Sequence, residues 1–90
     1  MALRILSSPP PEPEAISREI REAIQTALPG AQVEVRSGSP GHFEIHVVSE
    51  VFAGLPRVKQ QQRVYAAIRG LMAGDAPPVH AVDRMVTQTP

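Results

Sequence analysis

The sequence has no cysteine and no tryptophan, and aromatic residues make up only 3% of its 90 positions. Without cysteine the chain has no disulfide framework, no thiolate metal site and no thiol nucleophile. Nine basic residues balance nine acidic ones, so no global field attracts nucleic acid or an anionic membrane. No apolar run is long enough to span a bilayer or to act as a secretory signal. We therefore expect a soluble, cytoplasmic chain that folds by packing alone, without a membrane.

Proline is abundant but unevenly distributed, since four of the ten prolines gather between positions 9 and 13. Proline lacks a backbone N–H and fixes φ, so this segment suits neither a helix interior nor an inner strand. The composition predicts a flexible, proline-rich leader over residues 1–12. The remaining residues, 13–90, suffice for one domain with a modest core.

The first half of this domain contains a helical pattern followed by two alternating patterns. Apolar residues recur at helical spacing from Pro13 until Pro29 and Gly30 end the helix, namely Ile16, Ile20, Ile24, Ala27 and Leu28. Residues 32–36 alternate like a half-buried strand, and residues 37–41 have the composition of a turn. The second strand of this hairpin has an apolar face, and His42, Glu44 and His46 lie on its other face.

The second half predicts a short helical turn over 49–54, a long helix and a third strand. The long helix begins at Leu55–Pro56 and ends at Gly74, and its expected buried stripe comprises Val58, Gln61, Val64, Tyr65, Ile68, Leu71 and Met72. The third strand covers residues 79–87, with His80 at its beginning. About thirty residues separate strands two and three, which permits a parallel crossover. The expected architecture is α+β, with helices packed on one face of a three-stranded mixed sheet.

The three histidines are the candidate metal ligands, because imidazole binds iron and zinc well. From the sequence alone, the preferred explanation of His80 is a strand-end residue that bonds a carbonyl, and that of His46 is a solvated polar face. A catalytic zinc site of three histidines is disfavoured, because no HExxH-like pairing is present. The serines lack the G-x-S-x-G elbow of acyl-transfer enzymes, and the chain has no P-loop or dinucleotide fingerprint. We expect a protein that is not an enzyme.

Five segments in order resemble the BolA family and together cover residues 15 to 90. They are Gly41–Ile45 (GHFEI), Val48–Gly54 (VSEVFAG), Arg57–Tyr65 (RVKQQQRVY), Val79–Val82 (VHAV) and Thr87–Pro90 (TQTP). Each segment alone is weak, but the ordered set is specific. The lysine and glutamines at 59–62 and the short turn before Gly41 are similar to the IbaG (YrbA) branch of the family.

This resemblance implies a class II KH-like fold with the order αββααβ, and it implies partners. BolA-like proteins pair with a monothiol glutaredoxin in a heterodimer that holds a [2Fe-2S] cluster. The glutaredoxin cysteine and a glutathione thiol are ligands in that complex, so the isolated chain holds no cofactor. The family's histidine ligand corresponds to His80, and the metal-competent residue for the second ligand is His42. The implied role is an adaptor in iron–sulfur trafficking and iron homeostasis.

A basic stretch supports an alternative function. Arg57, Lys59 and Arg63, with Arg69 beyond them, form the one local positive field of this neutral chain. The short helix, the turn at Gly54, Leu55 and Pro56, and the following helix can be drawn as a helix-turn-helix, which would give a KH-like, DNA-binding transcriptional or stress-response regulator. Nucleic-acid-binding KH domains use a G-x-x-G loop, and in this sequence the second glycine is replaced by Arg57. The favoured interpretation is therefore a solvated face that docks a protein partner or glutathione.

Two simpler interpretations complete the sequence-based predictions. Tyr65 and Phe52 lie within the apolar pattern, which favours core positions over base-stacking platforms. The open face of the sheet offers a surface for a homodimer, in which the histidines never meet a metal.

Overall fold

The computed structural model describes residues 12–90, so the predicted leader over 1–12 lies almost entirely outside the described residues. The chain folds into α1 (Pro13–Ala27), β1 (Gln32–Ser37), β2 (His42–Val48), the 3₁₀ turn η1 (Glu50–Phe52), α2 (Arg57–Ala67), α3 (Arg69–Met72) and β3 (Ala81–Gln88). No helix within residues 12–90 has the length and apolar character needed to cross a membrane.

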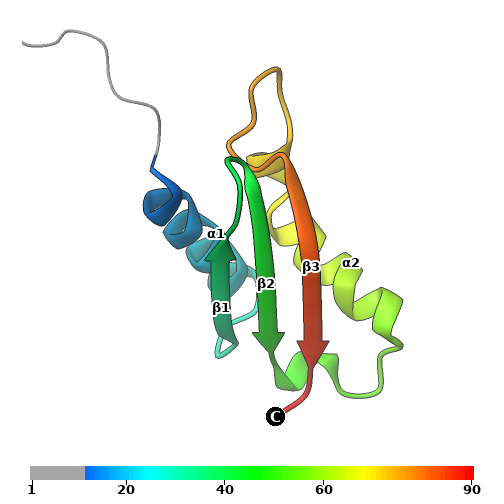
Figure 1. Cartoon of the computed structure of the whole chain (residues 1–90). Helices are drawn as coiled ribbons and strands as arrows, with labels where there is room; N and C mark the ends of the chain where they lie inside the picture. The colour runs from blue at the N-terminus through cyan, green and yellow to red at the C-terminus, as the bar shows by residue number, and fades with distance from the viewer. Residues whose placement is uncertain (1–11) are drawn as a thin grey trace, which may run out of the picture.

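The three strands form one mixed sheet in the order β1-β2-β3. The hairpin strands β1 and β2 are antiparallel, whereas β2 and β3 are parallel. The helices cover one face of the sheet and leave the other face open (Figure 1). The α+β architecture, the element order and the parallel crossover predicted from the sequence are confirmed, while the KH-like classification stays a prediction.

Helix α1 packs on the sheet through the isoleucines of its predicted stripe. Ile16, Ile20, Ile24 and Leu28 are buried, and Pro13 with Glu14 occupies the first turn, where proline and acidic residues suit a helix. The prediction was wrong for Ala27, which is exposed. Its methyl group is too small to close a shallow hollow between α1 and the α2–α3 segment, which Ala27 lines together with Ala67.

The predicted long helix is interrupted at Ile68, which ends α2 and precedes α3. Val64 and Ile68 are fully buried, but Val58 and Tyr65 are 57% and 41% exposed, so the predicted stripe was too wide. Each residue turns a helix by about 100°, so the position after Val64 points well away from the buried line. Tyr65 is therefore a surface residue and not a core residue, whereas Phe52 is buried as predicted.

The core lies between the sheet and the helices and is almost entirely aliphatic. Phe43, Ile45 and Val47 of β2 supply its centre, because β2 is the middle strand and its inner face is covered completely. The fully buried side chains that pack around them are Ile20, Ile24, Phe52, Val64, Ile68 and Val79.

Gln60 of α2 connects three elements through its side-chain amide. Its Nε2 donates to the carbonyl oxygens of Leu55 at 2.9 Å and Phe52 at 3.3 Å. Its Oε1 accepts from the hydroxyl of Thr87 in β3 at 2.7 Å. Thr87 is buried, so its hydroxyl has few alternative partners. One side chain thus holds the turn after η1 and the end of β3 against α2.

We predict that Gln60→Ala lowers the free energy of unfolding by about 1–3 kcal/mol, because it leaves part-buried polar groups without partners. Urea denaturation monitored by circular dichroism measures the change. The matched control is Gln62→Ala on the same helix, where the side chain is exposed and the change should stay within about 0.5 kcal/mol. Equal effects of the two substitutions would contradict the role given to Gln60.

Candidate functional site

The candidate site is the corner where the β1–β2 turn meets the beginning of β3. The carbonyl oxygen of Gly41 accepts the N–H of His80 at 2.8 Å and the N–H of Ala81 at 3.1 Å. His42 pairs directly with Ala81 in the parallel register. The two predicted ligands, His80 and His42, therefore lie close together at one end of the sheet, although about forty residues separate them in sequence.

His80 lies just outside the strand that was expected to contain it, because β3 begins at Ala81 and not at Val79. Val79 is fully buried, and its N–H donates to the carbonyl oxygen of Leu71 at 3.1 Å. The backbone is thus held on both sides of His80, while His80 itself is exposed. An exposed imidazole on a fixed backbone is available to a partner without rearrangement of the fold.

Gly41 makes room for the His80 ring. A Cβ atom at position 41 would lie 2.5 Å from Cγ and 2.9 Å from Cε1 of His80, and nearer still to Nδ1. These separations are shorter than real side chains tolerate, so only glycine allows the ring to lie against the turn. Gly41 also has a φ of +81°, in the left-handed region that glycine adopts without strain.

His42 is held from the side by Asp83 of β3. Its Nδ1 lies 2.9 Å from Oδ1 of Asp83, and the two side chains are 38% and 51% exposed. The register between β2 and β3 shifts after Phe43, so Val82 pairs with Phe43 and Arg84 with Glu44. Asp83 is the additional residue of this bulge, which turns its carboxylate toward His42 on the open face.

His46 is engaged elsewhere, with its Nε2 2.9 Å from Oε1 of Gln88 at the far end of β3. Four residues separate His42 from His46, which corresponds to about 13 Å along a strand. That distance is unfavourable for the binding of one zinc ion by both rings. Within residues 12–90 no group of three or more His, Asp or Glu side chains is placed to hold a metal ion.

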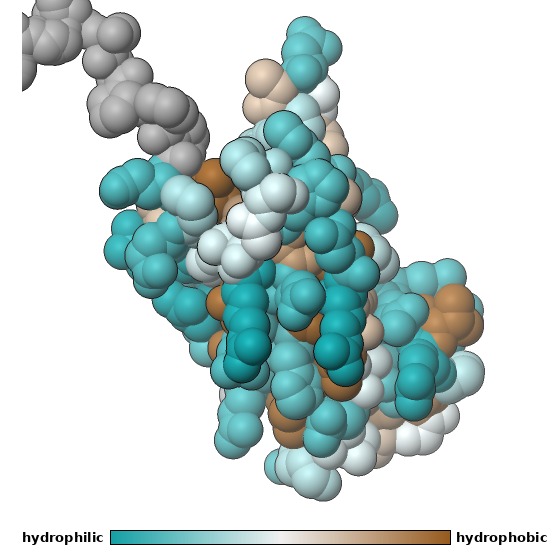
Figure 2. All heavy atoms as spheres, in the orientation of Figure 1, coloured by the Kyte–Doolittle hydropathy of each residue, from teal (hydrophilic) through white to brown (hydrophobic). Residues whose placement is uncertain are grey.

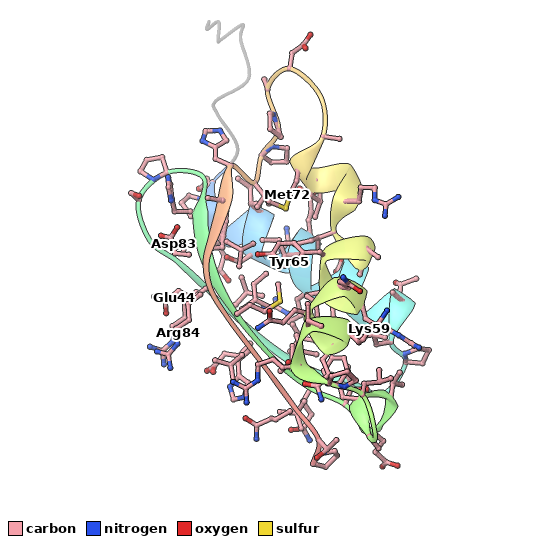
Figure 3. All side chains as sticks on the ribbon, turned by 90° about the vertical axis from the view of Figure 1, so that its right-hand side faces the viewer. Glu44, Lys59, Tyr65, Met72, Asp83 and Arg84 are labelled. Carbon is pink, nitrogen blue, oxygen red and sulfur yellow. The ribbon has the colours of Figure 1, made fainter. Side chains whose placement is uncertain are left out.

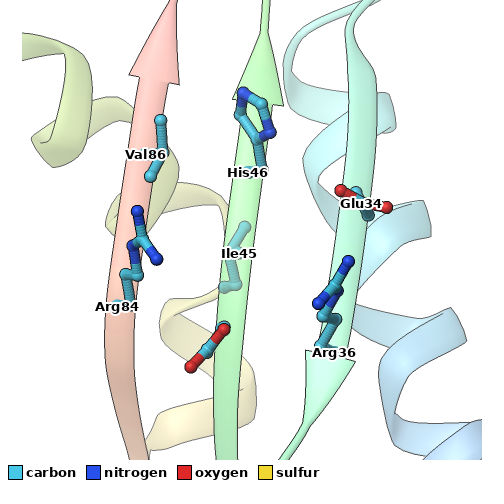
Figure 4. Close-up of a pocket in the computed structure, with 7 residues that line it drawn as sticks. Glu34, Arg36, Ile45, His46, Arg84 and Val86 are labelled. Carbon is cyan, nitrogen blue, oxygen red and sulfur yellow. The ribbon is translucent and has the colours of Figure 1, made fainter.

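The open sheet face is strongly hydrophilic, as the space-filling view shows (Figure 2). Its centre carries a shallow hollow of about 280 Å³ (Figure 4). Glu44 lies between Arg36 and Arg84 in the register, and Glu34 pairs with His46. Charges of both signs alternate across this face, so the face has no excess charge of one sign that would attract an anion or a cation.

The basic residues of the alternative prediction are exposed but do not form a compact patch. Lys59 and Arg63 lie four residues apart and share one side of α2, whereas Arg57 lies about 200° around the helix from Lys59. Lys59 points away from the sheet, on the opposite side of the molecule from Glu44 and Arg84 (Figure 3). The short helical turn predicted over 49–54 is the three-residue 3₁₀ turn η1, so the first helix of the helix-turn-helix drawing has only one turn.

The donors at the corner fit iron but do not complete a metal site. Imidazole nitrogens are suitable ligands for a [2Fe-2S] cluster, in which histidine replaces thiolate on one iron in some proteins. The chain has no cysteine, so any such cluster would need thiolates from another molecule. Two accessible imidazoles at one edge therefore suit a shared site between molecules and not a closed one.

Comparisons with known proteins identify the family of the chain. The profile of the family described as BolA-like protein matches residues 17–90. The acid stress protein IbaG of Escherichia coli strain K12 is 38% identical over 66 residues, covering 73% of this chain and 75% of IbaG. The BolA domain of SufE1 from Arabidopsis thaliana superposes with a TM-score of 0.68 at 27% identity, covering 84% of this chain and 93% of that domain. A bolA protein homologue from Coxiella burnetii gives a TM-score of 0.67 at 30% identity, with 82% and 90% coverage.

The chain therefore belongs to the BolA-like family, and its predicted similarity to IbaG is confirmed. Sequence reasoning did not identify Asp83 or Gly41 as parts of the site. Nothing in the sequence marks Asp83, because a bulge depends on the partner strand. For Gly41 a signal was present, because a glycine at the end of a turn permits another group to approach the backbone closely. In this protein that group is the His80 ring.

We predict that Gly41→Ala displaces the His80 ring and lowers the free energy of unfolding by about 1–2 kcal/mol, the usual cost of a left-handed L-residue. The chemical shifts of the His80 imidazole, measured by NMR, report the displacement. Gly38→Ala is the matched control, because that glycine lies in the same turn with open space around it and only His42 O nearby at 3.8 Å. Unchanged His80 shifts in Gly41→Ala would show that the ring does not depend on this contact.

Proposed function

We propose that this BolA-like protein is an adaptor that pairs with a monothiol glutaredoxin and supplies histidine ligands to a [2Fe-2S] cluster shared between the two proteins. His80 is the main ligand and His42 is the second. The cluster is cargo in iron–sulfur trafficking and iron homeostasis, and the remaining ligands are the glutaredoxin cysteine and a glutathione thiol. The adaptor performs no catalysis, acts in the cytoplasm and changes the stability or destination of the cluster.

One observation supports this proposal, namely that His42 pairs with Ala81, the neighbour of His80, at a single corner of the sheet. Gly41 accepts two backbone hydrogen bonds from His80 and Ala81, and His42 follows it directly. Both imidazoles reach the surface at this corner, where a partner could approach them. The absence of cysteine from the chain is also consistent with a division of ligands in which the thiolates come from other molecules.

We predict that His80→Ala abolishes or strongly weakens the shared cluster without unfolding the protein, because His80 is exposed. The experiment mixes the chain with a monothiol glutaredoxin, iron, sulfide and glutathione under anaerobic conditions. It then compares the visible circular dichroism spectrum of the cluster between variants. His46→Ala is the matched control, since its ring is engaged by Gln88 at the other end of the sheet. An unchanged cluster spectrum in His80→Ala would refute the ligand assignment.

A second candidate function, DNA binding as a transcriptional or stress-response regulator, rests on Lys59 and Arg63. Both are exposed on one side of α2, and neither forms an ion pair within the part of the chain that the structure describes. Phosphate contacts from such residues would make binding depend steeply on salt. Two features make this function less favoured than the adaptor. Arg57 stands where the G-x-x-G loop of nucleic-acid-binding KH domains has its second glycine, and η1 has only three residues.

We predict that, if DNA binds here, Arg63→Glu lowers the slope of log affinity against log salt by about one per lost phosphate contact. Fluorescence anisotropy with a labelled duplex over a salt series measures the slope. Arg18→Glu on the exposed side of α1 is the control, since it changes the net charge equally at a distant place. Equal slopes for both variants, or no binding at low salt, would exclude this function.

A further inference from the structure

We infer that Asp83 is a positioning residue for His42 and that it makes Nε2 the nitrogen that His42 offers to a metal. This inference rests on the proposed function, because it concerns the second ligand of the shared cluster. The observation behind it is the 2.9 Å approach of His42 Nδ1 to Asp83 Oδ1. Asp83 is present at this place because of the bulge between β2 and β3.

The chemistry of the two groups determines which ring nitrogen is free. An ionised carboxylate only accepts hydrogen bonds, so the proton of the bond must lie on Nδ1 of His42. In the neutral imidazole the other nitrogen, Nε2, then carries a lone pair and can coordinate a metal. A carboxylate that accepts from the non-ligating nitrogen also fixes the ring orientation and increases the basicity of the ligand.

His46 provides an internal comparison on the same strand. Its Nε2 lies 2.9 Å from the side-chain oxygen of Gln88, which as an amide oxygen can only accept. With the Gln88 oxygen as acceptor, the proton of His46 lies on Nε2, so this nitrogen has no lone pair for a metal. The two histidines of β2 are thus set in opposite tautomers by different residues of β3. Of these two histidines, only His42 has an Nε2 without a partner among residues 12–90.

The same corner orients His80 in a similar way. The three His80 atoms nearest to the place that a Cβ of residue 41 would occupy are Nδ1, Cγ and Cε1, and Nε2 is not among them. The Nδ1 side of each ring is therefore turned to the protein, by Asp83 for His42 and by Gly41 for His80.

The first test uses the chain alone and needs no cluster. Long-range ¹H–¹⁵N NMR spectra, recorded above the pH range in which imidazoles usually titrate, identify the tautomer of each histidine. We expect the proton of His42 on Nδ1 in the wild type and a shift toward the Nε2–H form in Asp83→Ala. Asp83→Asn should retain the wild-type tautomer, because its amide oxygen still accepts. Gln88→Ala is the matched control and should change His46 but leave His42 as it is.

The second test measures the lifetime of the cluster assembled with a monothiol glutaredoxin, iron, sulfide and glutathione. Loss of a residue that orients a metal-bound histidine typically lowers metal affinity about 10- to 100-fold. We expect the cluster to be lost at least about tenfold faster in Asp83→Ala, with substantial recovery in Asp83→Asn and no change in Gln88→Ala.

The outcomes separate this inference from the proposed function. If the wild type takes up no cluster, the proposed function fails, and the spectra of the free chain still decide whether Asp83 sets the tautomer. If the cluster assembles but Asp83→Ala changes neither tautomer nor lifetime, the inference is wrong and the proposed function stands. A changed tautomer with an unchanged cluster lifetime would overturn the role of Asp83 in ligation.

Discussion

The arrangement of the site depends on the two hydrogen bonds that the carbonyl oxygen of Gly41 accepts from His80 and Ala81. These bonds start the parallel pairing of β2 with β3, and they connect the hairpin turn to the end of a long helical crossover. Without them His42 and His80 would belong to separate loops. The left-handed φ of Gly41 and its missing side chain allow this close approach. A backbone constraint thus places two side chains that the sequence separates widely.

Strong periodic patterns made much of the fold predictable. The isoleucines of α1 and the alternation around Phe43 and Ile45 reflect burial of one face of each element, and such burial produces a regular spacing of apolar residues in the sequence. The break at Ile68 was not predictable, because the apolar spacing continues through it into α3. Tyr65 was misplaced for a related reason, since the buried line of α2 is narrower than its apolar pattern. Packing against neighbouring elements decides such details.

The candidate site was predictable only in part and for a different reason. The resemblance to the BolA family pointed to His80 and His42, but it did not indicate how either ring is held. The contact of His42 with Asp83 arises from a bulge that adds one residue to β3. Pairing registers are properties of two strands, so neither strand alone contains that information. The neutral net charge similarly gave no sign that both charge signs alternate across the open face.

The absence of cysteine is the feature that the proposed function explains most simply, because the partner and glutathione would supply the thiolates. Anaerobic co-purification with a monothiol glutaredoxin, followed by iron and sulfide analysis, tests this account most directly. The account predicts a complex that contains both proteins with iron and acid-labile sulfide in equal amounts, and that loses both ions when His80 is replaced by alanine. A complex without iron, or no complex at all, would contradict it.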